Sequence, residues 1–332
     1  MANVLFQNAL LKKRQSTPPI WFMRQAGRYH SHYRKLKEKY TFEQLCKSPE
    51  LAAEVAKGPI DEFDFDVAIL FSDILFVLEG LGLELKFDPG PKFGSYINSD
   101  NYKNYNNVDK AIEHLKFQSD AIKFTRQSIS NSKSLIGFVG GPWTLTRYAF
   151  GKDYFKNNNK NLYFDFLSLT LLPLLKQNIK LQLEAGAEIV MIFDSSLYDL
   201  EILDFKENYT RILEDISVSY PNKVGYYSRG KKEADLLRCM QYPFAGFGFD
   251  ASIDLKYVFQ NQKNGFIQGN FDEKLMLLNS DQFKQELQKY IEFMKTIENR
   301  DGWVCGLGHG INKETPEKNV HLFIENIRKE FS

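Results

Sequence analysis

Cysteine is one of the residue types that this sequence has little of. Only Cys46, Cys239 and Cys305 occur among 332 residues, and they are too far apart to form a CxxC pair. Neither a disulfide framework nor a multi-cysteine zinc site is therefore expected. The five histidines form no HExxH motif, so they predict no metal site either.

An excess of charge of either sign is also absent. Lysine and arginine total 43 against 42 aspartates and glutamates, which gives a formal net charge of +1. This balance disfavours a nucleic-acid-binding module, because such modules carry an excess or a stripe of positive charge. It does not disfavour a small acidic ligand, for which positive charge need gather only at one pocket.

Long hydrophobic runs are missing as well. Uncharged stretches such as residues 134–146 end after about a dozen residues, whereas a membrane span needs about 20. The first basic residues of the chain follow an apolar stretch, which is the reverse of the order in a secretory signal peptide. We therefore expect a cytoplasmic protein without a membrane segment.

No low-complexity stretch divides the chain. The two most polar segments, residues 99–110 and 151–161, are rich in asparagine and are predicted to be loops, because asparagine favours turns. Neither segment is long enough to separate two independently folded parts. We therefore predict a single domain over residues 1–332.

What the sequence does contain is a series of eight short apolar runs. Continuous rather than alternating hydrophobicity is typical of strands that are buried on both faces. Helical patterns lie between most of the runs, and strands that alternate with helices pair in parallel through crossovers. Eight such units predict an α/β fold, a single (β/α)8 TIM-type barrel, with an open doubly wound sheet as the alternative. The runs are residues 19–25, 67–73, 135–143, 188–195, 223–229, 244–250, 265–272 and 303–309.

Two of the helical patterns carry signals for an end or a kink. Residues 48–58 begin with Ser48 as a predicted N-cap, and Gly58 is predicted to end the helix. Residues 162–186 predict a long apolar helix with a kink near Pro173. The kink is expected because proline cannot donate the backbone hydrogen bond that an uninterrupted helix needs.

Polar residues follow the ends of six apolar runs, which is where the active site of a parallel barrel lies, at the C-terminal mouth of the strands. Arg24 and Arg28 flank a glycine-containing turn, and a guanidinium offers a fork of donors that matches carboxylates or phosphates. Asp73 ends a buried strand, so its carboxylate must be paired, hydrated or functional. His309 stands between two glycines that leave it little shielded. Each residue alone could be an ordinary loop residue, but six polar strand ends at one mouth favour a site.

Six motifs make the chain resemble the uroporphyrinogen decarboxylase family. They occur in the family order over roughly residues 18–320, and the seven contiguous matches in the first motif are the most specific. The motifs are MRQAGRY at 23–29, FSDIL at 71–75, GGPWTLTRY at 140–148, IFDS at 192–195, QGN at 268–270 and GLGHGI at 306–311.

The resemblance implies a cofactor-free carboxy-lyase. Members of this family are dimeric single-domain (β/α)8 barrels that use neither a metal nor an organic cofactor. They remove the carboxyl groups of four acetate side chains from uroporphyrinogen III, which gives coproporphyrinogen III and carbon dioxide in porphyrin and haem biosynthesis. By resemblance we therefore expect a tetrapyrrole substrate, a homodimer, no metal and no cofactor.

The resemblance also implies which side chains act. Asp73 matches the residue that binds the pyrrole N–H groups at the centre of the macrocycle, and one carboxylate can accept several such bonds. Its charge would stabilise the cation that forms when a pyrrole ring is protonated for decarboxylation. Arg24 and Arg28 match binders of substrate carboxylates, and with Asp73 they are the expected catalytic residues. The expected substrate-binding residues are Arg24, Gln25, Ala26, Gly27, Arg28, Asp73, Tyr148, Ser195 and His309.

The proton that each decarboxylation consumes has more than one possible donor. Arginine is a poor acid, with a pKa above about 12, so Arg24 and Arg28 are expected to position groups rather than to donate protons. A water or a substrate carboxyl group held by one of them is the preferred donor. Arg147 is a further basic residue that we expect near the same mouth.

Two other functional classes stay open on the sequence. A corrinoid-dependent methyltransferase shares this barrel but binds zinc through histidine and cysteine, and Cys305 is the only thiol near His309. A catalytically inactive barrel that serves as a binding protein is also compatible with the fold, because a fold does not fix a function. The joint presence of Asp73, Tyr148 and His309 argues against such decay.

Overall fold

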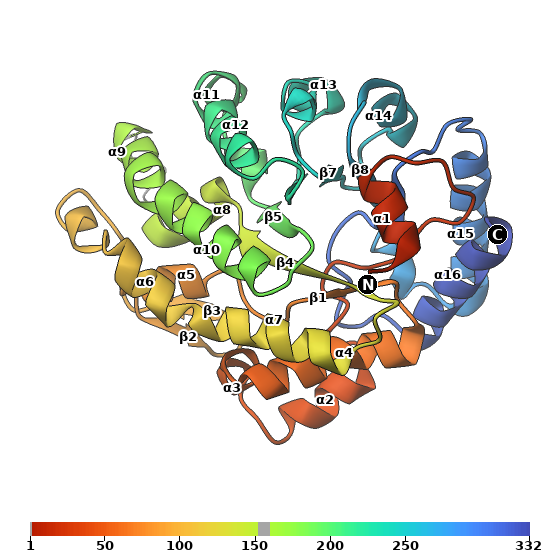
Figure 1. Ribbon diagram of the computed structural model, residues 1–332, viewed down its shortest axis with the longest axis horizontal. Helices are drawn as coiled ribbons and strands as arrows, with labels where there is room; N and C mark the ends of the chain where they lie inside the picture. Colours follow the sequence, from red (N-terminus) through yellow and green to blue (C-terminus); the bar gives the residue numbers. More distant parts are fainter. Residues whose placement is uncertain (1, 152–159) are drawn as a thin grey trace.

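Within the residues that the structure describes, 2–151 and 160–332, seven parallel strands form a curled sheet with helices around its outside (Figure 1). This structure is a computed structural model. The strands follow one another in the order β1-β4-β5-β6-β7-β8-β9, so each neighbour is reached through a crossover. They are β1 Val67–Ile69, β4 Ser134–Gly140, β5 Val190–Asp194, β6 Val224–Ser228, β7 Gly246–Gly248, β8 Phe266–Phe271 and β9 Trp303–Leu307, and a small hairpin pairs β2 Leu85–Phe87 with β3 Pro91–Phe93.

The first predicted strand, residues 19–25, is not confirmed as a strand. It forms a single parallel bridge between Ile20 and Cys305. The N–H of Cys305 in β9 donates to the carbonyl of Pro19 at 2.9 Å, and the N–H of Asp66, just before β1, donates to the carbonyl of Ile20 at 3.0 Å. The segment therefore lies between the two edges of the sheet and is hydrogen bonded to both.

Side chains explain why this segment is not a regular strand. The carboxylate of Asp66 accepts from the Ile20 N–H at 2.8 Å, and the amide oxygen of Gln25 accepts from the Phe22 N–H at 3.2 Å. The chain then turns, since the Gln25 N–H donates to the carbonyl of Phe22 at 3.0 Å. Donors that a ladder would need are thus taken by side chains and by a turn.

The helices follow the strands and cover the outer face of the sheet (Figure 1). The N-terminal helix α1 differs, because it contacts β8 and β9. The helices are α1 Val4–Leu10, α2 Ser31–Lys37, α3 Phe42–Lys47, α4 Pro49–Phe63, α5 Phe76–Gly80, α6 Val108–His114, α7 Lys116–Ser128, α8 Pro142–Phe150, α9 Lys160–Phe166, α10 Leu172–Glu184, α11 Ile202–Asp204, α12 Thr210–Ser219, α13 Glu233–Leu236, α14 Leu255–Asn261, α15 Ser280–Lys295 and α16 Glu317–Glu330.

The prediction that Gly58 ends a helix is wrong. Helix α4 continues past it to Phe63 and ends at Asp64, which takes the left-handed conformation with φ 60°. Close packing explains the glycine at position 58 instead, because a Cβ there would lie 2.5 Å from Cδ2 of the His32 ring. The predicted start is confirmed, since Ser48 is the N-cap residue of α4, although its side chain makes no capping hydrogen bond.

The long apolar helix predicted for residues 162–186 is confirmed with an interruption. It consists of α9, a π-helical turn over Leu167–Leu171 and α10. Pro173 lies just after that turn, where its missing N–H removes a donor from the α-helical pattern. Of the two predicted loops, the first contains a 3-10 turn at Tyr102–Asn104 and the start of α6, and most of the second (151–161) lies outside the described residues.

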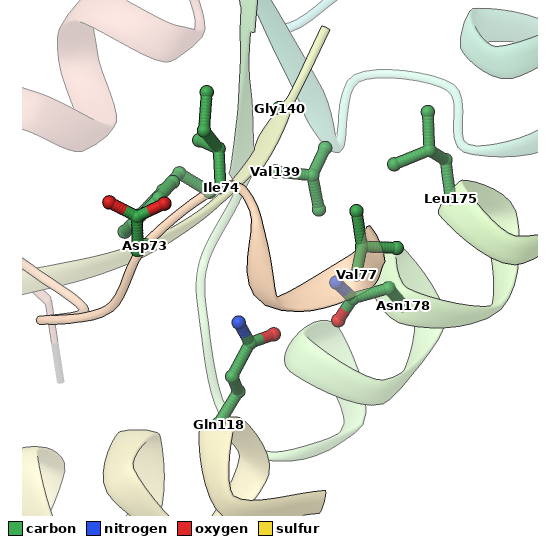
Figure 2. Close-up of a pocket in the computed structure, with 9 residues that line it drawn as sticks. Asp73, Ile74, Val77, Gln118, Val139, Gly140, Leu175 and Asn178 are labelled. Carbon is green, nitrogen blue, oxygen red and sulfur yellow. The ribbon is translucent and has the colours of Figure 1, made fainter. Parts of the chain in front are cut away.

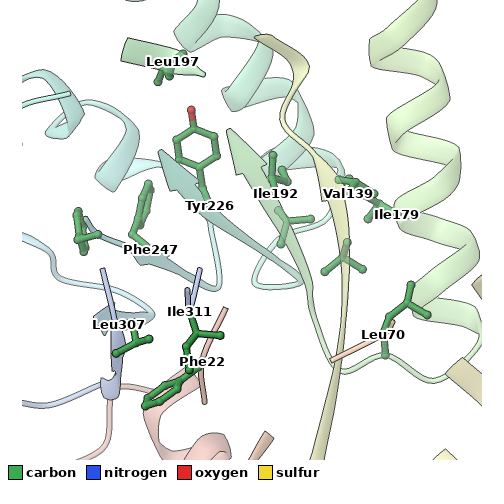
Figure 3. Packing of buried hydrophobic residues seen from close by; sticks show 14 of the residues in the cluster. Phe22, Leu70, Val139, Ile179, Ile192, Leu197, Tyr226, Phe247, Leu307 and Ile311 are labelled. Atoms are coloured by element: carbon green, nitrogen blue, oxygen red, sulfur yellow. The ribbon is translucent and has the colours of Figure 1, made fainter. Parts of the chain in front are cut away.

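Two clusters of buried side chains pack on opposite faces of the sheet. Figure 3 shows the outer cluster, in which Val139, Ile192, Tyr226 and Phe247 follow one another along β4 to β7. The inner core is built by the alternate residues of the strands together with helix α1, because successive strand residues point to opposite faces. Its members include Phe6, Ala9, Trp21, Met23, Val67, Ile69, Ile136, Met191, Phe193, Tyr227, Phe266 and Val304.

Candidate active site

Asp73 lies in the loop after β1, at the carboxyl end of the strands. Its Oδ1 accepts a hydrogen bond from the Leu75 N–H at 2.8 Å, and Oδ2 accepts none from the described residues. Burial raises the pKa of Asp73 to about 6, while the Leu75 N–H and the nearby charge of Arg24 act in the opposite direction. The carboxylate is therefore ionised at neutral pH but keeps lone pairs that the protein leaves unused.

A small pocket adjoins Asp73 on the side of α7 and α10 (Figure 2). Asp73 stands at the left of the view, the Gln118 amide lies below it, and the Asn178 amide lies to the right beside Val77. The Gln118 amide donates to the Ser72 hydroxyl at 3.0 Å. The buried Gln118 amide thus supports the loop that presents Asp73.

Arg24 is the positive group whose charge acts on several other candidate site residues. Its backbone has φ 64°, an uncommon conformation for a residue other than glycine. The guanidinium forms no ion pair with any described residue, and its charge reaches Asp73, Tyr148 and His309. Its side chain packs over Gly310, where a Cβ would lie 2.5 Å from the Arg24 Cδ. Gly310 therefore makes room for Arg24.

The rest of the MRQAGRY motif divides into a buried and an open part. The Gln25 side chain is buried and donates to the carbonyl of Val67 in β1 at 2.9 Å, so it anchors the turn to the sheet. The N–H groups of Ala26, Gly27 and Arg28 have no acceptor among the described residues. Successive free N–H groups in a turn can bind an anion.

Arg28 lies further toward α2 than Arg24 does. It is exposed and forms no ion pair among the residues described, and its charge acts on the phenol of Tyr33 in α2. No contact brings Arg28 to Asp73 directly. Its guanidinium is thus available at the rim rather than beside the carboxylate.

Tyr148 and Ser195 line the mouth from neighbouring elements. Tyr148 belongs to α8, is 37% exposed, and has a pKa raised by burial and by the charge of Asp73. Ser195 directly follows β5 and is half-buried, and its hydroxyl bonds to no described residue. Both hydroxyl groups can therefore bind a ligand.

His309 is held by a partner that the sequence did not reveal. The Tyr227 hydroxyl lies 2.9 Å from His309 Nδ1 and 2.9 Å from the carbonyl oxygen of Gly308, and the two rings stack. Burial lowers the pKa of His309 to about 4, with Arg24 and Arg229 acting in the same direction and Asp250 against them. His309 is therefore neutral at physiological pH.

Arg229 is a second residue that sequence reasoning missed. It directly follows β6, is exposed, and forms no ion pair in the described part of the chain. The signal was available, because residues 223–229 were predicted to end a strand at this mouth. Arg147, by contrast, was expected as a further basic residue near the mouth, and it is paired with Asp199. Arg147 is therefore occupied by the protein itself.

Asp194, in the same sheet, is an aspartate whose two carboxylate oxygens both accept hydrogen bonds from the protein. It ends β5 and is completely buried. Its Oδ1 accepts from the N–H and the hydroxyl of Thr144 at 2.9 and 2.7 Å, and its Oδ2 accepts from the hydroxyls of Tyr209 and Tyr226. Its hydrogen bonds join β5 to α8, β6 and the turn before α12, so its role is structural.

The described residues contain no group of three or more His, Cys, Asp or Glu side chains that could hold a metal ion. None of the helices in this part of the chain combines the length and apolar composition needed to cross a membrane.

Comparison with known proteins identifies the family. The family model for uroporphyrinogen decarboxylase matches residues 1–330. The chain belongs to the uroporphyrinogen decarboxylase family. A curated uroporphyrinogen decarboxylase of Vesicomyosocius okutanii is 36% identical over 96% of this chain and 96% of its own length. That of a Synechococcus strain is 34% identical over 94% of this chain and 93% of its own length.

Solved structures show that the fold of this uroporphyrinogen decarboxylase family member extends to other proteins. A methyltransferase from Methanosarcina mazei superposes with a TM-score of 0.80 at 18% identity, over 98% of both chains. A B12-independent methionine synthase from a Shewanella strain gives a TM-score of 0.56 at 11% identity, over 95% of this chain and 96% of that one. At such identities the likeness concerns the fold alone.

Proposed function

We propose that this protein decarboxylates the four acetate side chains of uroporphyrinogen III to give coproporphyrinogen III and carbon dioxide in porphyrin and haem biosynthesis. Membership of the family supports the reaction. The observation that carries it to this chain is Asp73, an ionised carboxylate with unused lone pairs beside the unpaired Arg24. A tetrapyrrole with inward N–H groups and outward carboxylates complements both charges.

Asp73 acts on the centre of the macrocycle. Its free lone pairs accept the pyrrole N–H groups, and its charge lies next to the ring that becomes a cation. Protonation of a ring carbon makes that ring an electron sink, the bond to the acetate carboxyl breaks, and carbon dioxide leaves. The exocyclic carbon then takes a proton and the ring loses its own, so each decarboxylation consumes one proton. The substrate supplies the sink, which explains how the reaction proceeds without a cofactor.

The positive groups act on the periphery of the macrocycle. Arg24, Arg28 and Arg229 offer guanidinium groups that the described residues leave without an ion pair. The three N–H groups of Ala26, Gly27 and Arg28 offer a second kind of carboxylate site. Tyr148, Ser195 and His309 contact the remaining side chains, and Gln25 supports the turn from within. Arg24 and Arg28 position the water or substrate carboxyl group that delivers the proton.

The proposed assembly follows the family. The whole chain, residues 1–332, forms one domain, and the segment 19–22 serves as the eighth member of a (β/α)8 barrel because it is hydrogen bonded to β9 and to the residue before β1. The active protein is a homodimer in the cytoplasm, with no metal, no cofactor and no nucleic acid partner.

An anaerobic assay with uroporphyrinogen III tests this function. Chromatography should show the stepwise loss of carboxyl groups to coproporphyrinogen III, and the Asp73→Asn variant should lose this activity. Gly90→Ala serves as a matched control, because nothing lies within 4 Å of a Cβ placed there. Protein that binds the tetrapyrrole but releases no carbon dioxide would instead support an inactive binding protein.

A further inference from the structure

The contact between Tyr227 and His309 carries more information than the position of two rings. Tyr227 lies in β6, belongs to the inner core and is completely buried. Its hydroxyl is 2.9 Å from the Gly308 carbonyl oxygen and 2.9 Å from Nδ1 of His309. The rings stack with centroids 5.9 Å apart and planes inclined by 17°.

The two contacts of the Tyr227 hydroxyl can both be hydrogen bonds in only one arrangement of the hydrogens. A carbonyl oxygen can only accept, so in that arrangement the single hydrogen of the Tyr227 hydroxyl is donated to Gly308. The phenol oxygen is then the acceptor that faces His309, and Nδ1 must carry a hydrogen to complete the second bond. A neutral imidazole has only one N–H, so Nε2 is left without one.

We propose that Tyr227 is a positioning residue that holds His309 in the Nδ1–H tautomer, so that Nε2 meets the substrate as a hydrogen-bond acceptor. The group that Nε2 recognises is then a hydrogen-bond donor of the tetrapyrrole, a pyrrole N–H or a carboxyl group that carries its proton. This assignment rests on the proposed function for the identity of the ligand, but the tautomer itself does not.

Burial, together with the positive charges around it, keeps His309 neutral, which the tautomer requires. Arg24 from the first motif and Arg229 after β6 face it with positive charge, and Asp250 after β7 opposes them. Glu273, after β8, acts on Arg229 and on the Tyr227 phenol. With burial added, the pKa of His309 is lowered to about 4, so the imidazole stays neutral above pH 6.

Nitrogen NMR of the substrate-free protein tests the tautomer directly. In protein labelled with ¹⁵N-histidine at pH 7.5, Nδ1 of His309 should give the signal of a protonated nitrogen and Nε2 that of an unprotonated one. The His309→Gln variant identifies the signals. In Tyr227→Phe the acceptor is gone, and the hydrogen should move wholly or in part to Nε2.

Kinetics test the consequence for the substrate. Tyr227→Phe should raise the KM for uroporphyrinogen III about tenfold, as expected for one lost hydrogen bond, with kcat changed less than about twofold. Tyr226→Phe is the matched control. It removes a buried hydroxyl from the preceding residue of β6, and that hydroxyl donates to Asp194 at 3.1 Å rather than contacting His309. This control should leave the His309 signals and KM unchanged while stability falls.

The outcomes separate this inference from the proposed function. An Nε2–H tautomer in the wild-type protein, or His309 signals that are the same in Tyr227→Phe, would overturn the inference even in an active decarboxylase. Equal KM shifts in Tyr227→Phe and Tyr226→Phe would also overturn it, because they would indicate general loosening. A wild-type protein with the expected tautomer but no decarboxylation would instead refute the proposed function.

Discussion

Asp194 ends one parallel strand of the sheet and Asp73 follows another. The two carboxylates differ in the number of hydrogen bonds that they accept from the protein. Asp194 accepts four hydrogen bonds, from Thr144, Tyr209 and Tyr226. Asp73 accepts one, from Leu75. Both carboxylates are pushed toward the neutral form by burial, but only Asp194 has its lone pairs filled.

We propose that this difference separates a structural carboxylate from one that binds a ligand. A buried charge without partners costs stability, so a chain that keeps one does so where a ligand completes the bonds. The same distinction applies to arginine, since Arg147 is paired with Asp199 whereas Arg24 has no ion pair among the residues described. Unused bonding capacity, more than residue type, marks the site.

The largest effect on stability should come from replacing Asp194, the carboxylate that accepts four hydrogen bonds. Asp194→Ala removes the acceptor of four donors, so the hydroxyl hydrogens of Tyr209 and Tyr226 and the two donors of Thr144 lose their partner. We expect the free energy of unfolding to fall by about 3–5 kcal/mol, measured by urea denaturation. The activity of the molecules that remain folded should change little; a variant as stable as the wild type would remove the structural role.

Replacing Asp73, which accepts only one hydrogen bond, should reduce activity without reducing stability. Asp73→Asn should lower kcat roughly 100- to 1,000-fold, the usual cost of losing one preorganised electrostatic group. Its melting temperature should be equal to or above that of the wild type. A variant that is both inactive and strongly destabilised would show that Asp73 acts like Asp194.

The sign of the stability effect follows from the pKa of Asp73, which burial raises to about 6. A raised carboxyl pKa gives a contribution to stability that is complete below the unfolded value near 4 and is lost as pH rises through 6. At pH 7 the ionised group therefore costs stability, which asparagine avoids. The same pKa predicts that kcat/KM of the wild type declines below about pH 6, and an acid limb near pH 4 would contradict this.

A smaller effect is expected from displacing Arg24 without changing its charge. In Gly310→Ala the new Cβ would lie 2.5 Å from the Arg24 Cδ, so the guanidinium must move. We expect KM for uroporphyrinogen III to rise about tenfold, the loss of one hydrogen bond to a charged group. Gly90→Ala is the control with open space around the added methyl group, and equal KM values in the two variants would refute the positioning role of Gly310.

The smallest effect should come from the paired arginine. Arg147→Gln breaks the ion pair with Asp199, and partly exposed pairs of this kind contribute about 0–1 kcal/mol. We expect less than a threefold change in kcat/KM in the same assay. A loss comparable to that of Arg24→Gln would show that Arg147 binds substrate despite its partner.

Most of the fold could be predicted from hydrophobic pattern alone. The seven runs from residues 67–73 onward each contain a strand, because a strand buried on both faces needs a continuous apolar run. The first run failed as a strand for reasons that a pattern cannot show. Asp66 and Gln25 capture its backbone donors from other parts of the chain, and Gly58 was misread because its packing against His32 is tertiary.

The sequence could predict which residues form the candidate site, but not their hydrogen bonds and ion pairs. Motifs pointed to Arg24, Asp73 and His309, and the structure places Arg24 within electrostatic reach of both Asp73 and His309. That Tyr227 holds His309 has no sequence signal, because the two residues are 82 positions apart. Sequence also could not show that Arg147 is neutralised by Asp199 while Arg24 is left free.

The segment 19–22 connects the two edges of the sheet and leads directly into the turn that carries Arg24 and the free N–H groups. The backbone segment that joins the edges of the sheet is therefore continuous with the turn that is proposed to bind the ligand. A molecule that binds these N–H groups favours the conformation in which the segment is seated, and by linkage it stabilises the closed sheet. We therefore expect a bound ligand to hold the two edges of the sheet together, and the ligand-free protein to open first at this segment.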